Sequence, residues 1–180
     1  NKQGTPEKLK QYEKQFGYIY NKIEPYNLNG EIVSSSLIRQ KLTLGEIEKA
    51  NKMLFYNFYI EGKVVEGNRL GRTINFPTAN FLYNKSIIQI PYGVYFVKVT
   101  VENKTYFGVL NFGIKPTIEI SNKSPLCEVH ILDFSQDIYN KKIKVEFIKK
   151  LRDEKKFKSL DDLKQQITND VNKARQFFLI

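Results

Sequence analysis

The sequence predicts a mainly β fold, a barrel or sandwich of short antiparallel strands, with a mostly helical segment before it and one helix after it. Apolar and polar residues alternate with the period of half-buried strands over residues 95–101, 106–111, 126–132 and 143–148. Turn-forming residues separate these runs, and an apolar stripe with helical spacing follows over residues 160–178. Several short strands at such spacing are typical of a sandwich or barrel.

The C-terminal helix is expected to follow Ser159, because Asp162 lies three residues further on, as in a capping box. Its apolar residues recur at three- and four-residue steps, which places them on one face of the helix. We expect this face to plug the open side of the barrel. The face consists of Leu160, Leu163, Ile167, Val171, Ala174 and Phe178.

Residues 1–57 have a different character. We expect, in order, a helix over residues 7–16, an extended piece over residues 18–25, a helix from Leu37 that ends at Gly45, and a helix over residues 46–55. So short a segment cannot easily form a core of its own. We therefore expect it to be the end of a domain whose larger part lies outside this chain, and we place a domain boundary between residues 57 and 58.

The composition limits the class of protein. Lysine and arginine total 29 against 19 aspartate and glutamate residues, a net charge of +10 that is spread along the chain. This charge indicates either an anionic partner, which would be nucleic acid or a phosphorylated small molecule, or simply a solvated basic surface. A single cysteine excludes a disulfide framework and a cysteine-based zinc site, and no apolar run is long enough to span a bilayer. Because no secretory signal is visible, we expect a cytoplasmic protein. Because the chain does not begin with methionine, we expect that it was cut from a longer one.

A loop with two glycines is the first candidate site, and we call residues 67–72 the glycine loop. Gly67 and Gly71 relax the backbone, so that successive amide groups can converge on an anion. Arg69 and Arg72 add positive charge beside them. An ordinary surface turn is the alternative, and spacing alone favours it. The pattern is not that of a P-loop, because no Gly-Lys-Ser/Thr follows.

Pro77, Thr78 and Asn80 form the second candidate site. Proline favours an extended chain, in which Thr78 and Asn80 point to the same side. A hydroxyl and an amide oxygen form a neutral pair of oxygen ligands, suited to a Mg²⁺ ion that keeps its phosphate ligands. The alternative is a pair of polar residues on a solvent-facing strand.

Glu128 is the third candidate. Alternation along its strand directs Cys127, Val129 and Ile131 to the core, and Glu128 and His130 to the opposite face. A carboxylate on a rigid strand can orient and deprotonate a hydroxyl nucleophile, as phosphoryl transfer requires. An exposed strand carboxylate without a role is the alternative. We assign His130 no role and interpret Cys127 as a small core residue.

Together these stretches resemble riboflavin kinases. The resemblance rests on residues 62–67, 71–80, 91–95, 111–117, 128–131 and 151–157, which occur in the family's order. Together they cover residues 58–180. One departure is Asn75, where the family usually has glycine. Asparagine tolerates a positive φ better than most residues, so we expect the turn to form.

The resemblance implies a six-stranded antiparallel, Greek-key-like barrel with a C-terminal helix. It implies that ATP phosphorylates riboflavin to FMN, with ADP as the second product and Mg²⁺ as cofactor, in FMN and FAD biosynthesis. Glu128 would take the proton of the ribityl 5′-hydroxyl, and Thr78 and Asn80 would hold the metal and the phosphates. The other implied site residues are Gly67, Arg69, Gly71, Arg72 and Pro77 for ATP, Gly113, Pro116 and Thr117 in a flap, and Arg152 and Phe157 at the flavin.

Residues 1–57 resemble the end of the FMN adenylyltransferase module, a nucleotidyltransferase that precedes the kinase in bifunctional bacterial FAD synthetases. The residues that carry this resemblance are Ser34, Ser35, Ser36 and Arg39, at a helix start where amide groups and the helix dipole suit a phosphate. Ser36 stands where that family commonly has threonine. The paired-histidine motif that these transferases need is absent from the chain. We therefore expect adenylyl transfer only where a further N-terminal part is present.

Two alternative functions remain at this point. A non-catalytic basic barrel could stack the bases of single-stranded nucleic acid on its aromatic residues. No stripe of basic and aromatic residues is visible, however, so neither nucleic acid nor a membrane is the expected partner. The other alternative is a barrel that binds flavin without kinase activity.

Overall fold

A computed structural model describes residues 4–67, 70–84, 86–114 and 125–180. These residues form two compact units, one that ends at Ser34 and one that runs from Ser35 to Ile180. The predicted boundary between residues 57 and 58 concerns the two resembled modules, and it stays a prediction.

The first unit contains two short helices and a hairpin. Helices α1 (Pro6–Gln11) and α2 (Glu13–Phe16) cover the predicted helix, and β1 (Asn27–Leu28) pairs with β2 (Glu31–Ile32). The extended piece expected over residues 18–25 contains no strand. None of the buried hydrophobic residues lies in the described part of this unit, as we expect for a segment too short to form a core.

The second unit is a barrel of six antiparallel strands, which confirms the fold expected from the resemblance. The strands are β3 (Tyr59–Lys63), β4 (Ala79–Leu82), β5 (Gly93–Val101), β6 (Lys104–Ile114), β7 (Pro125–Ile131) and β8 (Lys142–Arg152). They follow one another in the order β3-β8-β5-β6-β7-β4. A bridge between Val65 and Asn80 joins the two ends of this order, where the Val65 N–H donates to the Asn80 carbonyl over 2.8 Å. The sheet is therefore nearly closed on itself.

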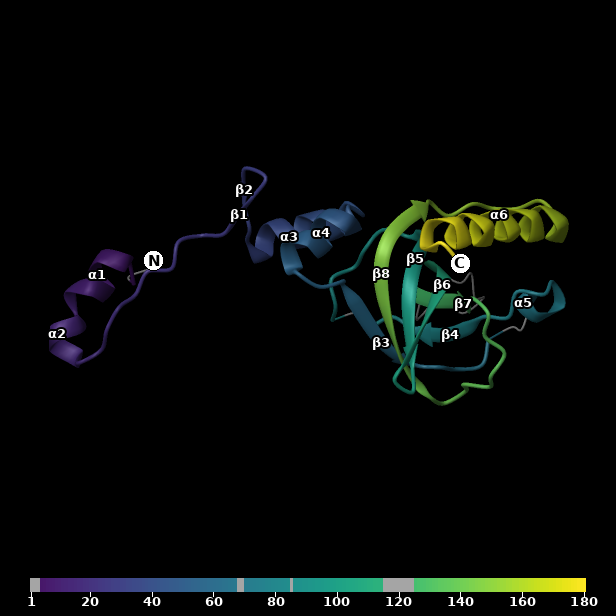
Figure 1. The fold of residues 1–180 in the computed structure, drawn as a ribbon, viewed down its shortest axis with the longest axis horizontal. Helices are drawn as coiled ribbons and strands as arrows, with labels where there is room; N and C mark the ends of the chain where they lie inside the picture. Colours follow the sequence, from purple (N-terminus) through teal and green to yellow (C-terminus); the bar gives the residue numbers. More distant parts are fainter. Residues whose placement is uncertain (1–3, 68–69, 85, 115–124) are drawn as a thin grey trace. The chain divides into compact units, whose positions relative to one another are not determined.

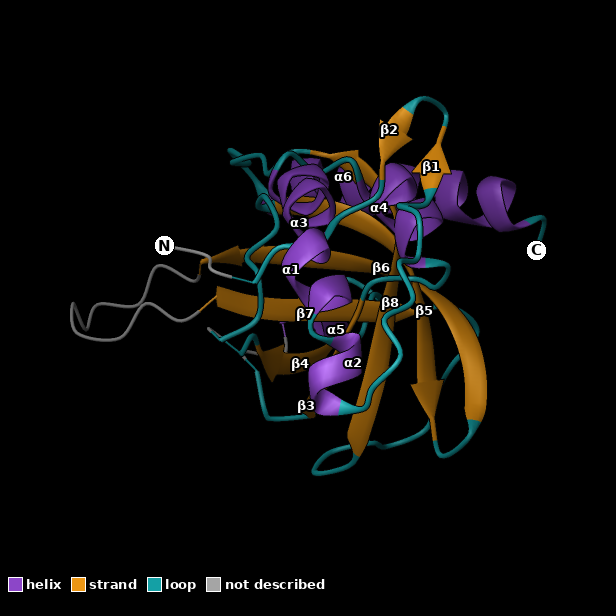
Figure 2. Ribbon diagram, turned by 90° about the vertical axis from the view of Figure 1, so that its left-hand side faces the viewer, coloured by secondary structure: helices purple, strands orange, loops and turns teal. Residues whose placement is uncertain are grey.

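Large aromatic side chains fill the interior of the barrel. Tyr95, Phe81, Phe112 and Phe147 are all fully buried, together with the predicted core residue Cys127. Figure 2 shows the strands curving around this interior. Side chains therefore fill the middle of the barrel.

The C-terminal helix α6 (Leu160–Phe178) lies along the outer face of the barrel (Figure 1). It starts as predicted, since the Ser159 hydroxyl accepts a hydrogen bond of 3.1 Å from the Asp162 N–H. Val171 and Ala174 pack with Val94 and Phe96 of β5 in a second cluster outside the barrel. The expectation that α6 plugs the open side is therefore wrong. Strand β5 is accordingly buried on both faces over its first half, instead of half-buried throughout as its alternation predicted.

Helices α3 (Ser35–Thr43) and α4 (Ile47–Leu54) precede the barrel strands in the sequence and pack on the barrel. Leu42, Ile47 and Ala50 belong to the barrel's core cluster, and Gly45 between the helices has a φ of 75°. The Asn51 amide donates to the Phe147 carbonyl over 2.8 Å and thereby attaches α4 to β8. A fifth helical turn, α5 (Leu70–Thr73), lies within and just after the glycine loop. In the part of the chain that the structure describes, no helix is both long and apolar enough to cross a membrane.

We predict that truncating Phe147 greatly lowers the free energy of unfolding. Its ring lies 5.2 Å from that of Tyr95 and 5.7 Å from that of Phe58. Phe147→Ala should lower the free energy of unfolding by about 3–5 kcal/mol in urea denaturation, because it leaves a cavity in the core. As a control, Leu160→Ala removes an exposed side chain and should change this free energy by less than about 0.5 kcal/mol. Equal changes in the two variants would contradict this packing.

Candidate functional site

Asn80 lies where three predicted features meet. It pairs with Glu128 across the β4–β7 ladder, and Glu128 pairs in turn with Asn111 of β6. Residues directly opposite each other in antiparallel strands share a face of the sheet. Ala79 and Phe81 belong to the barrel core, so Asn80 and Glu128 lie on the outer face. The predicted acid and the predicted metal ligand are thus neighbours on one surface.

Thr78 and Asn80 lie side by side, as the sequence predicts. Asn80 Nδ2 is 3.4 Å from the Thr78 carbonyl oxygen and 3.5 Å from Thr78 Oγ1. Asn80 is only 5% exposed, yet its Oδ1 accepts no hydrogen bond from any described residue. A buried acceptor without a partner is costly unless a ligand satisfies it. A neutral oxygen beside a hydroxyl is a fitting donor set for a hard cation such as Mg²⁺.

The glycine loop packs directly on this pair. A Cβ at Gly67 would lie 2.5 Å from Asn80 Nδ2, and one at Gly71 would lie 2.2 Å from the Phe76 carbonyl oxygen. Only glycine permits such close approach. The turn that follows has Asn75 at a φ of 66°, which confirms the expectation that asparagine adopts the positive φ there. Arg69 lies outside the described residues.

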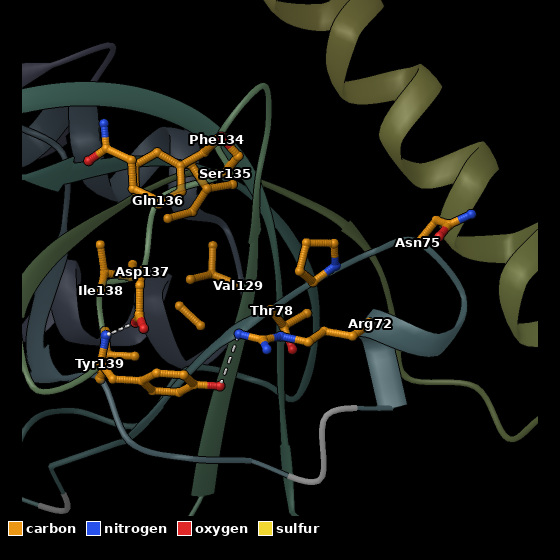
Figure 3. Close-up of a pocket in the computed structure, with 14 residues that line it drawn as sticks. Arg72, Asn75, Thr78, Val129, Phe134, Ser135, Gln136, Asp137, Ile138 and Tyr139 are labelled. Atoms are coloured by element: carbon orange, nitrogen blue, oxygen red, sulfur yellow. Dashed lines mark hydrogen bonds between the residues drawn. The ribbon is translucent and has the colours of Figure 1, made fainter.

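A larger cavity, of about 560 Å³, opens on one side of Thr78. Arg72, Pro77 and Thr78, which the resemblance assigns to the nucleotide, line it. Figure 3 shows the Arg72 side chain reaching toward Tyr139, whose hydroxyl is 3.5 Å from Arg72 Nη2. Phe134 and Tyr139, from the connection between β7 and β8, supply aromatic surface that could stack against a base.

A smaller cavity, of about 310 Å³, opens on the other side of Thr78. It contains the predicted base Glu128 and the predicted flavin-pocket residues Arg152 and Phe157. Its apolar wall is formed by Ile74, Phe76, Val94, Val109, Leu163 and Ile167. Thr78 is the residue that lines both cavities, while Gly71 lines the smaller and Arg72 the larger. The site therefore consists of two chambers with a shared wall.

Arg152 is held in the smaller cavity by a buried carboxylate. Asp170 of α6 is 2% exposed and accepts from Arg152 Nη2 over 2.7 Å and from Nε over 3.0 Å. The Gln166 amide also donates to Asp170, over 2.9 Å. This fork-like pairing fixes the plane of the guanidinium group. The helix that covers the barrel thus also orients a side chain of the cavity.

Glu154 is a second carboxylate in the smaller cavity. It packs on Gly113 so closely that a Cβ there would lie 1.8 Å from Glu154 Oε1. Burial raises the pKa of the Glu154 carboxyl; nearby Arg152 opposes this shift and the charge of Glu128 adds to it. Because Gly113 has no side chain, it leaves the space that the Glu154 carboxylate occupies.

His130 lies next to Glu128 on the outer face and lines the same cavity. Its Nδ1 is 2.9 Å from the Pro77 carbonyl oxygen, and its ring meets Phe76 edge-on at 5.4 Å. Burial lowers the pKa of the imidazole, so His130 is neutral at neutral pH.

The structure gathers most of the predicted site residues but not all of them. Gly67, Gly71, Arg72, Pro77, Thr78, Asn80, Gly113, Glu128, Arg152 and Phe157 all lie at or beside the two cavities. Pro116 and Thr117 lie outside the described residues. Ser34, Ser35, Ser36 and Arg39 are exposed before and along α3 and line neither cavity.

Sequence reasoning missed Asp170, Glu154, Phe134 and Tyr139. Asp170 had a signal, since it interrupts the apolar face of α6 three residues after Ile167 and four before Ala174. Glu154 lies between the predicted residues Arg152 and Phe157. Phe134 and Tyr139 had no such signal, because they lie in an irregular connection.

Comparison with known proteins shows the class. A family model described as "Flavokinase: Riboflavin kinase" matches residues 54–178. The chain therefore belongs to the riboflavin kinase family. It is 42% identical over 178 residues to the bifunctional riboflavin kinase/FMN adenylyltransferase of Haemophilus influenzae, covering 98% of this chain and 57% of that protein. It is 44% identical over 147 residues to the protein of the same description from Bacillus subtilis, covering 81% of this chain and 46% of that one.

A solved structure has the same fold. A Streptococcus pneumoniae chain, titled a macrolide-efflux protein, matches with a TM-score of 0.86 and 32% identity, over 96% of this chain and 55% of that chain. The chain spans about half the length of the curated relatives it matches.

Glu154 predicts a pH-dependent stability. Its pKa in the folded state is raised above the ordinary value of 4.5, so the protonated form stabilises the fold and this contribution is lost as pH rises from 4.5 through the raised pKa. Glu154→Gln removes the charge but keeps the shape. The melting temperature of this variant should match wild type in acid and exceed it at neutral pH. A constant difference across this range would contradict the prediction.

Proposed function

We propose that this chain phosphorylates the 5′-hydroxyl of riboflavin with ATP, giving FMN and ADP, as the kinase part of a bifunctional FAD synthetase. The observation that carries the proposal is the position of Thr78, in the wall between two cavities, with Glu128 in one of them. Two substrates that exchange a phosphoryl group need adjacent chambers that meet at the transferred group.

We assign ATP to the larger cavity and riboflavin to the smaller one. Aromatic Phe134 and Tyr139 suit an adenine base, and Arg72 suits the phosphates. The apolar wall of the smaller cavity suits a flat isoalloxazine ring, with Arg152 and Phe157 at its border. Both volumes lie within the range of about 300–1,000 Å³ that small-molecule sites usually have.

In the reaction, the ribityl 5′-oxygen forms a bond to the γ-phosphorus, and the bond from that phosphorus to the β,γ-bridging oxygen breaks. ADP leaves with the electron pair of the broken bond. Glu128 accepts the hydroxyl proton. Arg72 and the glycine loop stabilise negative charge on the phosphates.

Mg²⁺ is the metal we propose for this site. Thr78 Oγ1 and Asn80 Oδ1 would hold it, together with phosphate oxygens, because the buried Asn80 oxygen otherwise has no partner among the described residues. When bound, the ion would neutralise charge on the phosphates. The protein's own part is to keep these two side chains next to each other under Gly67.

We further propose that residues 1–57 are the end of an FMN adenylyltransferase module and that the protein is cytoplasmic. The alignment to the bifunctional Haemophilus influenzae protein supports the first point, because it covers 98% of this chain. The alternative of single-stranded nucleic acid binding is not favoured, since Tyr95, Phe81, Phe112 and Phe147 are buried and cannot stack bases. A flavin-binding protein without kinase activity would be recognised by the absence of ADP release in a coupled assay.

Glu128→Gln tests the base. The variant should lose about 100-fold or more in kcat, because a general base contributes on the order of 10²–10⁴-fold. Its affinity for riboflavin, measured by quenching of flavin fluorescence, should change little. Glu61→Gln is the matched control, since Glu61 is an exposed strand carboxylate paired with Lys142, and it should turn over like wild type. Wild-type kcat in Glu128→Gln would remove Glu128 from the mechanism.

Thr78→Ala tests the shared wall. It removes one hydroxyl that faces a charged group, which costs on the order of 1.5–3 kcal/mol and so weakens Mg·ATP binding about 10-fold or more. Calorimetric titration with Mg·ATP and with riboflavin should show a much larger loss for the nucleotide. Thr100→Ala, on β5 and away from both cavities, is the control. An unchanged nucleotide titration in Thr78→Ala would count against the assignment.

A further inference from the structure

His130 is a polar residue of the smaller cavity that the proposed reaction does not use. Among the described residues, its ring has one hydrogen-bond partner, the Pro77 carbonyl oxygen, which is 2.9 Å from Nδ1 and 53 residues away in the sequence. A carbonyl oxygen accepts and cannot donate, so Nδ1 carries the proton of this bond. In the neutral ring Nε2 is then the unprotonated nitrogen.

The bond replaces main-chain pairing at the point where pairing stops. The β4–β7 ladder ends at Ala79 opposite Val129. Pro77 has no N–H with which to continue a ladder, so its carbonyl is the group by which this part of the chain can be attached to β7. His130, the residue after Val129, supplies the donor from its side chain.

Thr78 therefore has an anchor on each side. Its C-terminal neighbour Ala79 is held by the ladder, and its N-terminal neighbour Pro77 is held by His130. The Phe76 ring packs edge-on against the imidazole, with 5.4 Å between the ring centroids, and so restricts the orientation of the His130 side chain. Among the described residues, the His130 bond is what ties the Pro77 carbonyl to β7.

We propose that His130 is a positioning residue: its Nδ1–H holds the Pro77 carbonyl and thereby keeps the Thr78 hydroxyl in the wall between the two cavities. This inference rests on the proposed function, in which that hydroxyl binds Mg·ATP. Residues that orient a metal ligand in this way typically change metal affinity or activity by about 10–100-fold when they are replaced.

The protonated nitrogen can be observed directly in the wild-type protein. His130 is the single histidine of the chain, so the ring nitrogens in a ¹⁵N NMR spectrum of histidine-labelled protein belong to this residue. We expect, at neutral pH, a protonated Nδ1 and an unprotonated Nε2. The opposite tautomer would overturn the proposal. This measurement needs neither substrate nor activity, so it stands apart from the test of the proposed function.

A pair of variants separates hydrogen bonding from packing. His130→Asn keeps an N–H donor at about the position of Nδ1, whereas His130→Leu fills the space without a donor. Calorimetry should show His130→Leu binding Mg·ATP about 10-fold or more weakly than wild type, with His130→Asn recovering most of this loss. Riboflavin affinity should change less than nucleotide affinity in both variants.

Three outcomes would overturn the proposal. Equal Mg·ATP affinities of His130→Leu and wild type would show that the bond is not needed, and an equal loss in both variants would show that donation is not what matters. A loss confined to riboflavin would reveal a packing role, because His130 lines the riboflavin side. Should His130→Leu fail to fold, the ¹⁵N NMR measurement of the His130 tautomer in the wild-type protein decides whether the proposal holds. A wild-type protein that binds Mg·ATP but forms no FMN would refute the proposed function while leaving the tautomer result intact.

Discussion

The barrel closes at Asn80, and the site depends on this closure. The Asn80 carbonyl accepts from the Val65 N–H, which joins the two ends of the strand order. The same residue turns its side chain outward, beneath Gly67 and opposite Glu128. The β4–β7 ladder holds Asn80 opposite Glu128, and the bond from Val65 brings the chain that leads into the glycine loop to the same residue. Closure of the barrel therefore places Gly67 beside the predicted metal ligand and the predicted acid.

The two cavities make use of different faces of the sheet. Core residues such as Ala79, Val129 and Ile131 line the larger cavity, whereas the smaller cavity has Glu128 and His130 of the outer face. Helix α6 serves two purposes. It covers apolar residues of β5, and it brings Asp170 to Arg152 at the edge of the smaller cavity. The packing of α6 therefore both buries apolar surface and orients a side chain of the smaller cavity.

Much of the fold and site was predictable because the relevant forces act between near neighbours. Alternation located the four long strands and put Glu128 and His130 on one face. The spacing of Thr78 and Asn80 in extended chain put their side chains together, and the hydroxyl of Ser159 marked the start of α6. The place of α6 was mispredicted, since an apolar stripe shows that a helix packs but not which surface it covers.

The sequence by itself determined the four long strands, the start of α6 and the family, and it predicted the main candidate site residues. Only the tertiary structure decided which distant residues meet: Asp170 with Arg152, His130 with Pro77, and Arg72 with Tyr139. The physical reason is that propensity and periodicity act over a few neighbouring residues, whereas these contacts arise when a sheet closes and a helix docks on it. The division of the site into two chambers with Thr78 between them belongs to this second kind of information.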